Sequence, residues 1–408
     1  MEAAGSKPDA MRRMRILHVV PTYYPAVRYG GPIRSVHGLA AALSRRGHDV
    51  HVYTTSVDGD RDLDVPLGQP VDLDGVSVHY FRVPALRRLY WSPGMRNELR
   101  KAVGSFDVVH LHSVFLWPMW AAARQAQRAR VPYIVTPRGM LIREMIQRKN
   151  RWIKAAWISL IERETFTGAA GVHATAELER EELQRFGWAL PEVAWIANGV
   201  EFPAIHSPRA AGPFAALAAR YVLFLSRISW KKGLDRLIAA WREVPDLTLV
   251  IAGNDDENYR PKLEALAQSM GVSNRVVFVG AVSDEHKWAL YAEAELLVLP
   301  SYSENFGNVV AEAMAMSCPV VVSPEVGIAR FVQAHGAGVV SQCAPGELAR
   351  SIRNLMADRL LRRQMGRRGA EAVRTHLSWE AVAQQMESFY SRAGNRRTDS
   401  TVPAVAPS

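Results

Sequence analysis

Two glutamates, Glu304 and Glu312, stand on either side of a predicted helix start in the segment SYSENFGNVVAEAMAM at residues 301–316. The pattern predicts a helix that begins near Phe306, with Asn305 as its N-cap. Eight residues of helix extend at most about 12 Å, which is of the order of the separation between ribose and sugar in a nucleotide-sugar. A single glutamate at a helix N-terminus is favoured by electrostatics alone. The pair and its spacing therefore carry the hypothesis that one carboxylate binds ribose and the other binds the sugar.

The same helix start could bind an anion. The backbone N–H groups of Phe306, Gly307 and Asn308 would have no partner within the helix, and such groups at a helix N-terminus suit a diphosphate. Gly307 would let the ligand approach the backbone closely. Val309, the next residue, belongs to the same predicted contact set.

A second motif, SRISWKKG at 226–233, supplies positive charge. Arg227 lies at the predicted end of a strand and Lys232 precedes a helix. Two cations opposite the helix start could hold both phosphates and neutralise the charge that develops on a leaving diphosphate. Lys231 is more readily explained as a solvated neighbour.

The N-terminal half holds weaker signals. In YGGPIRSV at 29–36, Gly30 and Gly31 could bring backbone N–H groups near a phosphate, or could simply form a turn. His110 and His112 share one face at the end of a predicted strand. Two histidines can indicate a metal pair, but no third ligand is evident nearby, so we predict no metal site and expect packed or hydrogen-bonded imidazoles.

Short β-branched runs alternate with helical patterns along the chain, which favours parallel sheets covered on both faces. The predicted strands are Arg15–Val20, Asp49–Thr55, Val76–Val83, Asp107–His112, Pro132–Pro137, Gly171–Thr175, Val193–Asn198, and, after the Pro- and Ala-rich stretch 202–218, Tyr221–Arg227, Leu247–Gly253, Arg275–Val282, Leu296–Pro300 and Pro319–Ser323. A helix is predicted at Ser35–Arg46, with Gly47 as its stop. The fold class is α/β, with two doubly wound, Rossmann-like domains that face one another and bind ligands beyond the carboxyl ends of their strands.

The composition fits a globular enzyme. Of the 408 residues, 48% are hydrophobic and 22% are charged, and no apolar run approaches the ~20 residues that span a bilayer. Two cysteines, Cys318 and Cys343, form neither a disulfide framework nor a metal motif. These features predict a cytoplasmic protein. The net charge of +10 favours anionic partners, but nucleic acid is not expected because the basic residues form no stripe interleaved with aromatics.

From about residue 14 to 391 the chain resembles glycosyltransferase family 4, a group of retaining GT-B enzymes. The matching pieces are the Arg and Lys of SRISWKKG, the Glu304/Glu312 pair and the NGV at Asn198–Val200. The resemblance implies a domain at 14–200 on the acceptor side and a nucleotide-sugar domain at 201–376. It further implies that a helix at 377–392 crosses back to the first domain, while 1–13 and 393–408 look disordered.

The resemblance implies that Arg227 and Lys232 bind the donor diphosphate, Glu312 the ribose and Glu304 the transferred sugar. A histidine near the end of its strand contacts the sugar in the family, and we assign this to His112. The implied reaction is hexosyl transfer with retention, in which the leaving phosphate takes the acceptor's proton, without a metal or cofactor.

The resemblance implies that the loop at Gly30 and Gly31 lies over the donor phosphates and helps to shape the acceptor site. TPRGM at 136–140 is similar to segments of a bacterial subset that builds surface glycans, so Arg138 is expected to face the substrate, and the acceptor is expected to be a glycan or a polyprenyl-diphosphate-linked molecule. One departure is SPEVGIARFV, where relatives carry a glycine-rich segment before Pro-Glu; Glu325 and Gly327 could fill part of its role.

Basic residues interleaved with tryptophan follow TPRGM, which is typical of a helix on an anionic membrane surface. The basic residues are Arg138, Arg143, Arg148, Lys149, Arg151 and Lys154, with Glu144 as the one acid, and the apolar ones are Trp152, Ile153, Trp157, Ile158 and Ile161. An ordinary solvated face explains the pattern equally well.

Two alternatives remain open, and a third does not fit the sequence. A GT-B sugar-nucleotide epimerase shares the fold, and a non-catalytic nucleotide-sugar-binding protein could retain it. A dinucleotide oxidoreductase would need a GxGxxG after a strand, which PTYYPAVRYGG after the first strand does not provide. The Asp-x-Asp pairs Asp62/Asp64 and Asp72/Asp74 look like the manganese motif of another fold, but we interpret them as turns, with Asp74-Gly75 as a hairpin turn.

Overall fold

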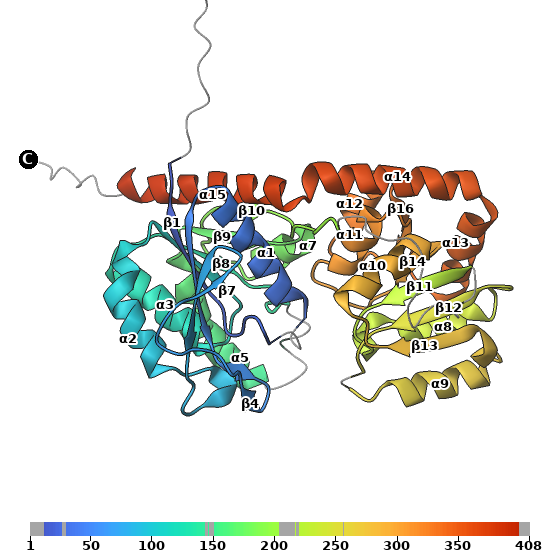
Figure 1. Ribbon diagram of the computed structural model, residues 1–408, viewed down its shortest axis with the longest axis horizontal. Helices are drawn as coiled ribbons and strands as arrows, with labels where there is room; N and C mark the ends of the chain where they lie inside the picture. The colour runs from blue at the N-terminus through green and yellow to red at the C-terminus, as the bar shows by residue number, and fades with distance from the viewer. Residues whose placement is uncertain are drawn as a thin grey trace, which may run out of the picture. The chain divides into compact units, whose positions relative to one another are not determined.

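The computed structural model describes residues 12–26, 30–142, 146, 151–203, 217, 220–255 and 257–399. The chain divides into two compact units. The first runs through Ala174 and also contains Glu182–Ile196 and the chain from Ala383 onward. The second contains Thr175–Glu181 and Ala197–Val382. Each unit is an α/β layer structure with helices on both faces of a parallel sheet (Figure 1).

The first unit is built on an eight-stranded sheet in the order β10-β9-β8-β7-β1-β2-β6-β5. Its strands are β1 (Arg15–Val19), β2 (Asp49–Thr55), β5 (Val71–Leu73), β6 (Val76–Phe81), β7 (Val108–His112), β8 (Tyr133–Thr136), β9 (Gly171–Ala174) and β10 (Val193–Trp195). Only β5 pairs antiparallel in this sheet, with β6. Asp74 and Gly75 connect the two with φ values of 54° and 78°, so the predicted hairpin turn is confirmed. A separate pair joins β3 (Val57–Asp58) and β4 (Arg61–Asp62).

The helices of the first unit follow the predicted alternation. They are α1 (Gly31–Arg45), α2 (Pro93–Ala102), α3 (Trp117–Arg128), α5 (Arg151–Trp157), a π-helical turn at Ile158–Glu162, and α6 (Arg163–Thr167). Helix α7 (Glu177–Gln184) spans both units. Helix α1 begins four residues earlier than predicted, because Pro32 suits the first helical turn.

The second unit has a six-stranded sheet, entirely parallel, in the order β13-β12-β11-β14-β15-β16. Its strands are β11 (Tyr221–Leu225), β12 (Thr248–Ala252), β13 (Val276–Gly280), β14 (Leu296–Leu299), β15 (Val320–Val322) and β16 (Gly338–Val340), the last of which was not predicted. Its helices are α8 (Leu234–Trp241), α9 (Arg260–Ser269), α10 (Asp284–Glu293), α11 (Asn308–Ala315), α12 (Ala329–Ala334), α13 (Pro345–Ala357) and α14 (Arg359–His376).

The central strands are buried along their whole length. All residues of β7, β8, β14 and β15 are buried, as expected for parallel strands covered on both faces. This burial on both faces explains why the sequence is almost continuously apolar along these strands. Most of the predicted linker at 202–218 lies outside the described residues.

The last helix, α15 (Trp379–Asp399), begins in the second unit and groups with the first from Ala383 onward. Glu387 has no exposed surface and accepts hydrogen bonds from Arg46 at 2.5 Å and His48 at 2.8 Å. Tyr390 bonds to His110 of β7 at 2.7 Å. The helix is thus tied to the first unit by buried polar contacts. Among the described residues, no helix combines the length and apolarity needed to cross a bilayer.

Candidate active site

In the second unit, the turn that carries Lys232 packs against the loop that carries Glu304. The two follow β11 and β14, which are parallel neighbours, so their loops emerge at the same edge of the sheet. The backbone N–H of Tyr302 donates to the carbonyl of Lys231 at 2.7 Å. Gly233 has a φ of 69°, and a Cβ there would lie 1.9 Å from the carbonyl oxygen of Pro300. Only glycine allows this close approach.

This packing brings two of the predicted residues into contact. The ammonium of Lys232 forms an ion pair with the carboxylate of Glu304. Their side chains are 12% and 20% exposed, so both ions retain some contact with solvent. The pair places one positive and one negative group side by side before any ligand binds.

The segment SPEVGIARFV, which departs from the family pattern, holds the backbone of Glu304 in place. The N–H of Glu304 donates to the carbonyl of Glu325 at 3.1 Å, and the N–H of Gly327 donates to the carbonyl of Glu304 at 3.0 Å. A Cβ on Gly327 would lie 1.9 Å from the carbonyl oxygen of Asn305. Both residues therefore act through the backbone, and Gly327 is needed for its lack of a side chain.

The predicted helix start was wrong by two residues. Helix α11 begins at Asn308, and its N-cap is Gly307, whose φ of 95° lies outside the helical region and which offers no side-chain cap. Asn305 instead donates from Nδ2 to Thr175 Oγ1 at 2.8 Å, and Phe306 is buried at 5% exposure. The half-buried residues Asn308 and Val309 form the first turn.

Asn198, from the NGV motif, reaches the same helix start. Its Nδ2 donates to Oδ1 of Asn308 at 3.1 Å. The next residue, Gly199, packs closely on Trp379, because a Cβ there would lie 2.2 Å from the indole ring. The motif thus braces α11 and the start of α15 within the second unit.

Glu312 is held by two residues that sequence reasoning missed. Lys287 donates to Oε1 at 3.0 Å and the hydroxyl of Tyr291 donates to Oε2 at 2.9 Å. Both lie on α10, four residues apart and therefore on one face, and both are largely buried. A buried lysine always needs a partner. The four-residue spacing between Lys287 and Tyr291 was the sequence signal that could have indicated a shared partner.

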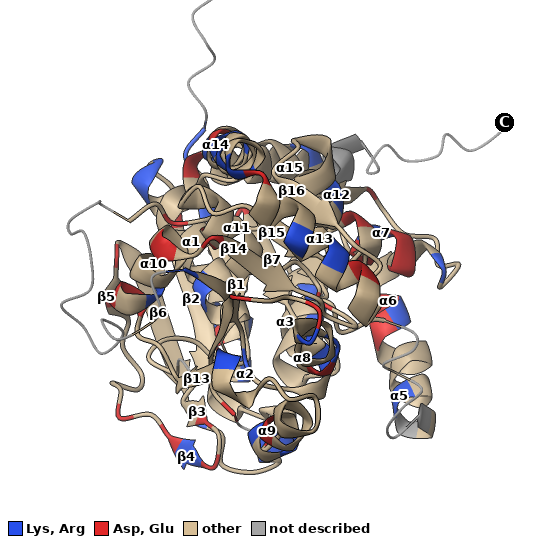
Figure 2. Ribbon diagram, turned by 90° about the vertical axis from the view of Figure 1, so that its right-hand side faces the viewer, with Lys and Arg blue, Asp and Glu red and all other residues tan. Residues whose placement is uncertain are grey.

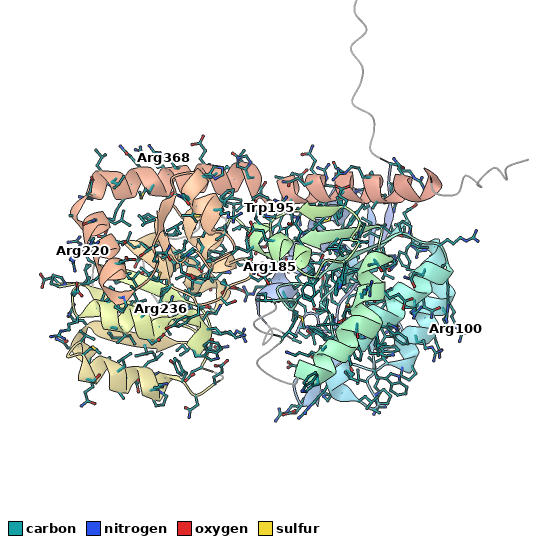
Figure 3. The ribbon with its side chains drawn as sticks, turned by 180° about the vertical axis from the view of Figure 1, so that it is seen from behind. Arg100, Arg185, Trp195, Arg220, Arg236 and Arg368 are labelled. Carbon is teal, nitrogen blue, oxygen red and sulfur yellow. The ribbon has the colours of Figure 1, made fainter. Side chains whose placement is uncertain are left out.

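Arg227 is exposed in the loop that follows β11. That loop is fixed by its backbone: the N–H of Ser226 donates to Ala252 at 3.1 Å and that of Ile228 donates to Asn254 at 2.7 Å. Nearby, the ring of Tyr302 lies 3.5 Å from the guanidinium of Arg236, which Figure 3 labels on α8. Arg227 thus sits at the same sheet edge as Lys232.

In the first unit, Arg138 connects three of the predicted pieces. Its Nη1 donates to Ser35 Oγ of α1 at 2.9 Å, and its Nη2 donates to His112 Nδ1 at 3.1 Å. Gly30 is the N-cap of α1 and Gly31 is its first residue, so the glycine loop, TPRGM and β7 converge here. Tyr29 lies outside the described residues.

A third histidine, His18 on β1, completes a cluster that the sequence did not reveal. Its Nδ1 lies 2.8 Å from Nε2 of His112, and the ligating atoms of His18, His110 and His112 lie within 4.8 Å of one another. Strand order explains this, because β1 and β7 are parallel neighbours with His18 opposite His110.

The cluster is better suited to hydrogen bonding than to a metal. Both ring nitrogens of His110 are engaged, with Tyr390 at 2.7 Å and Thr136 at 2.6 Å. The guanidinium of Arg138 contacts His112, and a second cation beside it would be repelled.

Burial keeps these imidazoles neutral. It lowers the pKa of His18 and of His173 to about 3, with the charge of Arg138 acting in the same direction. Burial also lowers the pKa of His110 and His112 well below the usual value. Among the described residues of this cluster, the cation Arg138 therefore lies beside neutral imidazoles.

Two doubly wound, Rossmann-like units in one chain are the architecture of the GT-B fold. Residues 30–199 match the family "Glycosyl transferase 4-like domain" and residues 214–372 match "Glycosyl transferases group 1". The chain belongs to glycosyltransferase family 4 and is a transferase.

Curated relatives match most of the length of the chain. It is 28% identical over 405 residues to an uncharacterized glycosyltransferase of Methanocaldococcus jannaschii, covering 93% of this chain and 98% of that one. It is also 28% identical over 430 residues to glycogen synthase of Mycobacterium tuberculosis, covering 96% and 98%. HepE of Anabaena, solved in complex with UDP and glucose, has the same fold, with a TM-score of 0.72 at 20% identity over 93% of this chain and 100% of that one.

Proposed function

We propose that this enzyme transfers a hexose, with retention of anomeric configuration, from a nucleotide diphosphate-sugar to a glycan or a polyprenyl-diphosphate-linked acceptor. The observation that carries the proposal is the ion pair of Lys232 and Glu304, held beside the start of α11 by the close packing of Gly233 on Pro300. A cation, a carboxylate and a helix N-terminus are the groups that a sugar diphosphate needs.

Donor binding would exchange the internal ion pair for ligand contacts. Arg227, Lys232 and the first N–H groups of α11, at Asn308 and Val309, bind the phosphates. Glu304, released from the ammonium, accepts hydrogen bonds from sugar hydroxyls. The partial exposure of both ions lowers the cost of this exchange. Glu312 accepts from the ribose hydroxyls.

The reaction needs charge neutralisation more than a general base. The bond between the anomeric carbon and the phosphate oxygen breaks, the acceptor oxygen bonds to that carbon on the same face, and its proton passes to the leaving phosphate oxygen. Lys232 and Arg227 stabilise the negative charge on the diphosphate. These cations and the helix start can do so without a metal. In the first unit, Gly30, Gly31 and Arg138 form the acceptor side of the proposal, and His112 contacts the transferred sugar.

A donor screen tests the proposal. Binding and slow hydrolysis of nucleotide-sugars are measured by calorimetry and by nucleotide release, beginning with UDP-glucose because the similar HepE structure contains UDP and glucose. The best donor is then offered lipid-linked and glycan acceptors, and NMR of the product gives its anomeric configuration. We expect retention, and the same rate in excess chelator. An inverted product, a chelator-sensitive rate or epimerisation without an acceptor would overturn it.

We further propose that α5 and the π-helical turn after it contact the inner face of the cell membrane, where a surface glycan would be built on a lipid carrier. Trp152 is 74% exposed and Leu160 is 73% exposed, and α5 extends away from its sheet (Figure 2). Of the basic residues in this stretch, Arg143, Arg148 and Lys149 lie outside the described residues.

Vesicle sedimentation tests the membrane contact. We expect binding to vesicles that contain anionic phospholipid, weaker binding to neutral vesicles, and a loss of at least about 10-fold in the double variant Trp152→Ser, Leu160→Ser. Trp195, which is 42% exposed on β10, provides the matched control Trp195→Ser (Figure 3). Equal loss in the control, or no preference for anionic lipid, would rule the surface out.

A further inference from the structure

We propose that Glu162 is a positioning residue for the loop that follows His112. Its carboxylate accepts a hydrogen bond from the backbone N–H of Phe115, within the four-residue connection between β7 and α3. The inference rests on the proposed function, in which His112, the last residue of β7, contacts the transferred sugar. Because the loop begins directly after His112, its conformation constrains where the imidazole lies.

The backbone of this loop needs support. Ser113 and Phe115 have φ values of 98° and 63°, in the left-handed region that residues with side chains rarely adopt. The N–H of Ser113 donates to the carbonyl of Thr136 at 2.9 Å, and the side chain of Val114 is buried. The first half of the loop is thus held by β8 and by the core. The N–H of Phe115 donates instead to Oε1 of Glu162 at 2.6 Å.

A π-helical turn brings Glu162 to this position. Across the turn at Ile158–Glu162, the indole N–H of Trp157 donates to the same Oε1 at 2.9 Å. In a regular α-helix, residues five positions apart point about 140° away from each other around the axis. The π-helical turn therefore allows Trp157 and Glu162 to meet. Such turns are rare and are frequent at functional sites.

An acid is an unusual residue for this buried position. Glu162 is 3% exposed, and among the described residues it forms no ion pair. Burial raises the pKa of its carboxyl group, and the N–H donors of Phe115 and Trp157 lower it in part. A buried carboxylate without a cation reduces stability, so packing alone would favour an apolar side chain here. The carboxylate contributes an acceptor for two N–H groups that an apolar side chain would leave without a partner.

Glu162 acts through the loop and not by contact with the substrate. Without an acceptor for its N–H, Phe115 can leave the left-handed conformation, and His112, three residues earlier, loses its fixed position. The diphosphate contacts of the proposed reaction belong to the second unit. Loss of the Glu162 bond should therefore lower kcat and leave the affinity for a nucleoside diphosphate unchanged.

Two conservative variants separate the hydrogen bond from the charge. Glu162→Gln loses the charge but keeps an oxygen that can accept from Phe115, so kcat should stay within about 3-fold of the wild type. Glu162→Asp keeps the charge, but its shorter side chain does not reach Phe115. Its kcat should fall at least about 10-fold, because a buried N–H without an acceptor costs this much. Equal rates in the two variants, or a slower Gln variant, would overturn the proposal.

Glu164 provides the matched control. It is an exposed acid on α6, two residues away, and it pairs with Arg124 at 2.7 Å. Glu164→Asp makes the same change in length and should keep the wild-type rate. Calorimetry should give the same dissociation constant for UDP in the wild type and in Glu162→Asp. Weaker UDP binding in Glu162→Asp, or an equal loss of kcat in the control, would mean a general disturbance of the fold and would overturn the positioning role.

A measurement without turnover separates this proposal from the proposed function. In nitrogen-15 NMR, the amide of Phe115 should be protected from hydrogen exchange in the wild type and in Glu162→Gln, and unprotected in Glu162→Asp. The ring resonances of His112 should shift in Glu162→Asp alone. Rapid exchange of Phe115 in the wild type, or an unchanged His112 ring in Glu162→Asp, would overturn the positioning role even if transfer is found. The expected spectra without transfer from any donor would instead overturn the proposed function.

Discussion

The polar clusters of the two units differ in how their buried groups are compensated. In the first unit, His18, His110 and His112 are neutral and 0–2% exposed. In the second, Lys232 and Glu304 are an ion pair whose side chains are 12% and 20% exposed. Removing an ion from water costs far more than burying a neutral, hydrogen-bonded ring. The first cluster can therefore be rigid and dry, whereas the second stays partly solvated and can exchange partners with a charged ligand.

The largest expected effect comes from removing the exchangeable cation. Lys232→Ala should lower kcat about 100- to 1000-fold, because a lost transition-state contact to a developing charge costs this much. Steady-state transfer at saturating donor measures it. Lys231→Ala is the matched control on the same turn and should stay near the wild-type rate.

The Lys232 variant also tests the comparison itself. If the ion pair only held the loop, the variant would unfold at lower temperature and would keep a kcat close to that of the wild type. Full activity with reduced stability would therefore mean that the second cluster is as structural as the first.

The second prediction concerns the neutral cluster and acidity. Since the folded pKa of His18 and of His173 is about 3, far below the value of about 6.5 in the unfolded chain, the unfolded state binds more protons below pH 6.5. The free energy of unfolding should therefore fall by up to about 1.4 kcal/mol per pH unit for each ring as pH decreases from 6.5 toward 3. Urea denaturation at pH 7, 6 and 5 measures the slope.

Replacing one histidine measures its contribution to the pH dependence of the free energy of unfolding. His173→Gln should make the dependence on pH less steep, because one proton fewer is taken up on unfolding. His376, exposed at the end of α14, is the control for loss of an imidazole. A wild-type slope that His173→Gln leaves unchanged would show that other groups cause the acid sensitivity.

The sequence predicted the α/β fold of both units well, and it selected two residues of the second unit that the structure places in contact, Lys232 and Glu304. Apolar runs placed both sheets, because parallel strands buried on two faces are apolar throughout. Lys232 and Glu304 were expected to bind one donor because both follow predicted strands and precede helices, but their ion pair was not predicted. Short edge strands such as β16 carried too few residues to be recognised.

The remainder depended on strand order and backbone conformation. His18 joins the cluster because β1 lies beside β7, which no local pattern reveals. Helix α11 starts at Asn308 because Gly307 adopts a left-handed φ. Glycine permits this conformation, but its presence in the sequence does not predict it. The residues that hold Glu312 lie on α10, and the spacing of Lys287 and Tyr291 alone does not identify Glu312 as their partner.

The smallest effect should come from the support of Glu312, which holds a charge but does not exchange it. Tyr291→Phe removes the hydrogen bond at 2.9 Å to Oε2 and should weaken nucleoside diphosphate binding about 5- to 10-fold with little change in kcat.

If Glu312 binds ribose, this loss should disappear with a 2′,3′-dideoxy analogue, which lacks the hydroxyls that Glu312 would accept from. Calorimetry with both ligands, on the wild type and Tyr291→Phe, completes the cycle, and Tyr259→Phe on the neighbouring α9 side is the control for loss of a phenol. An equal loss with the dideoxy analogue would place the role of Tyr291 in the packing of α10 against α11 and would remove Glu312 from the ribose.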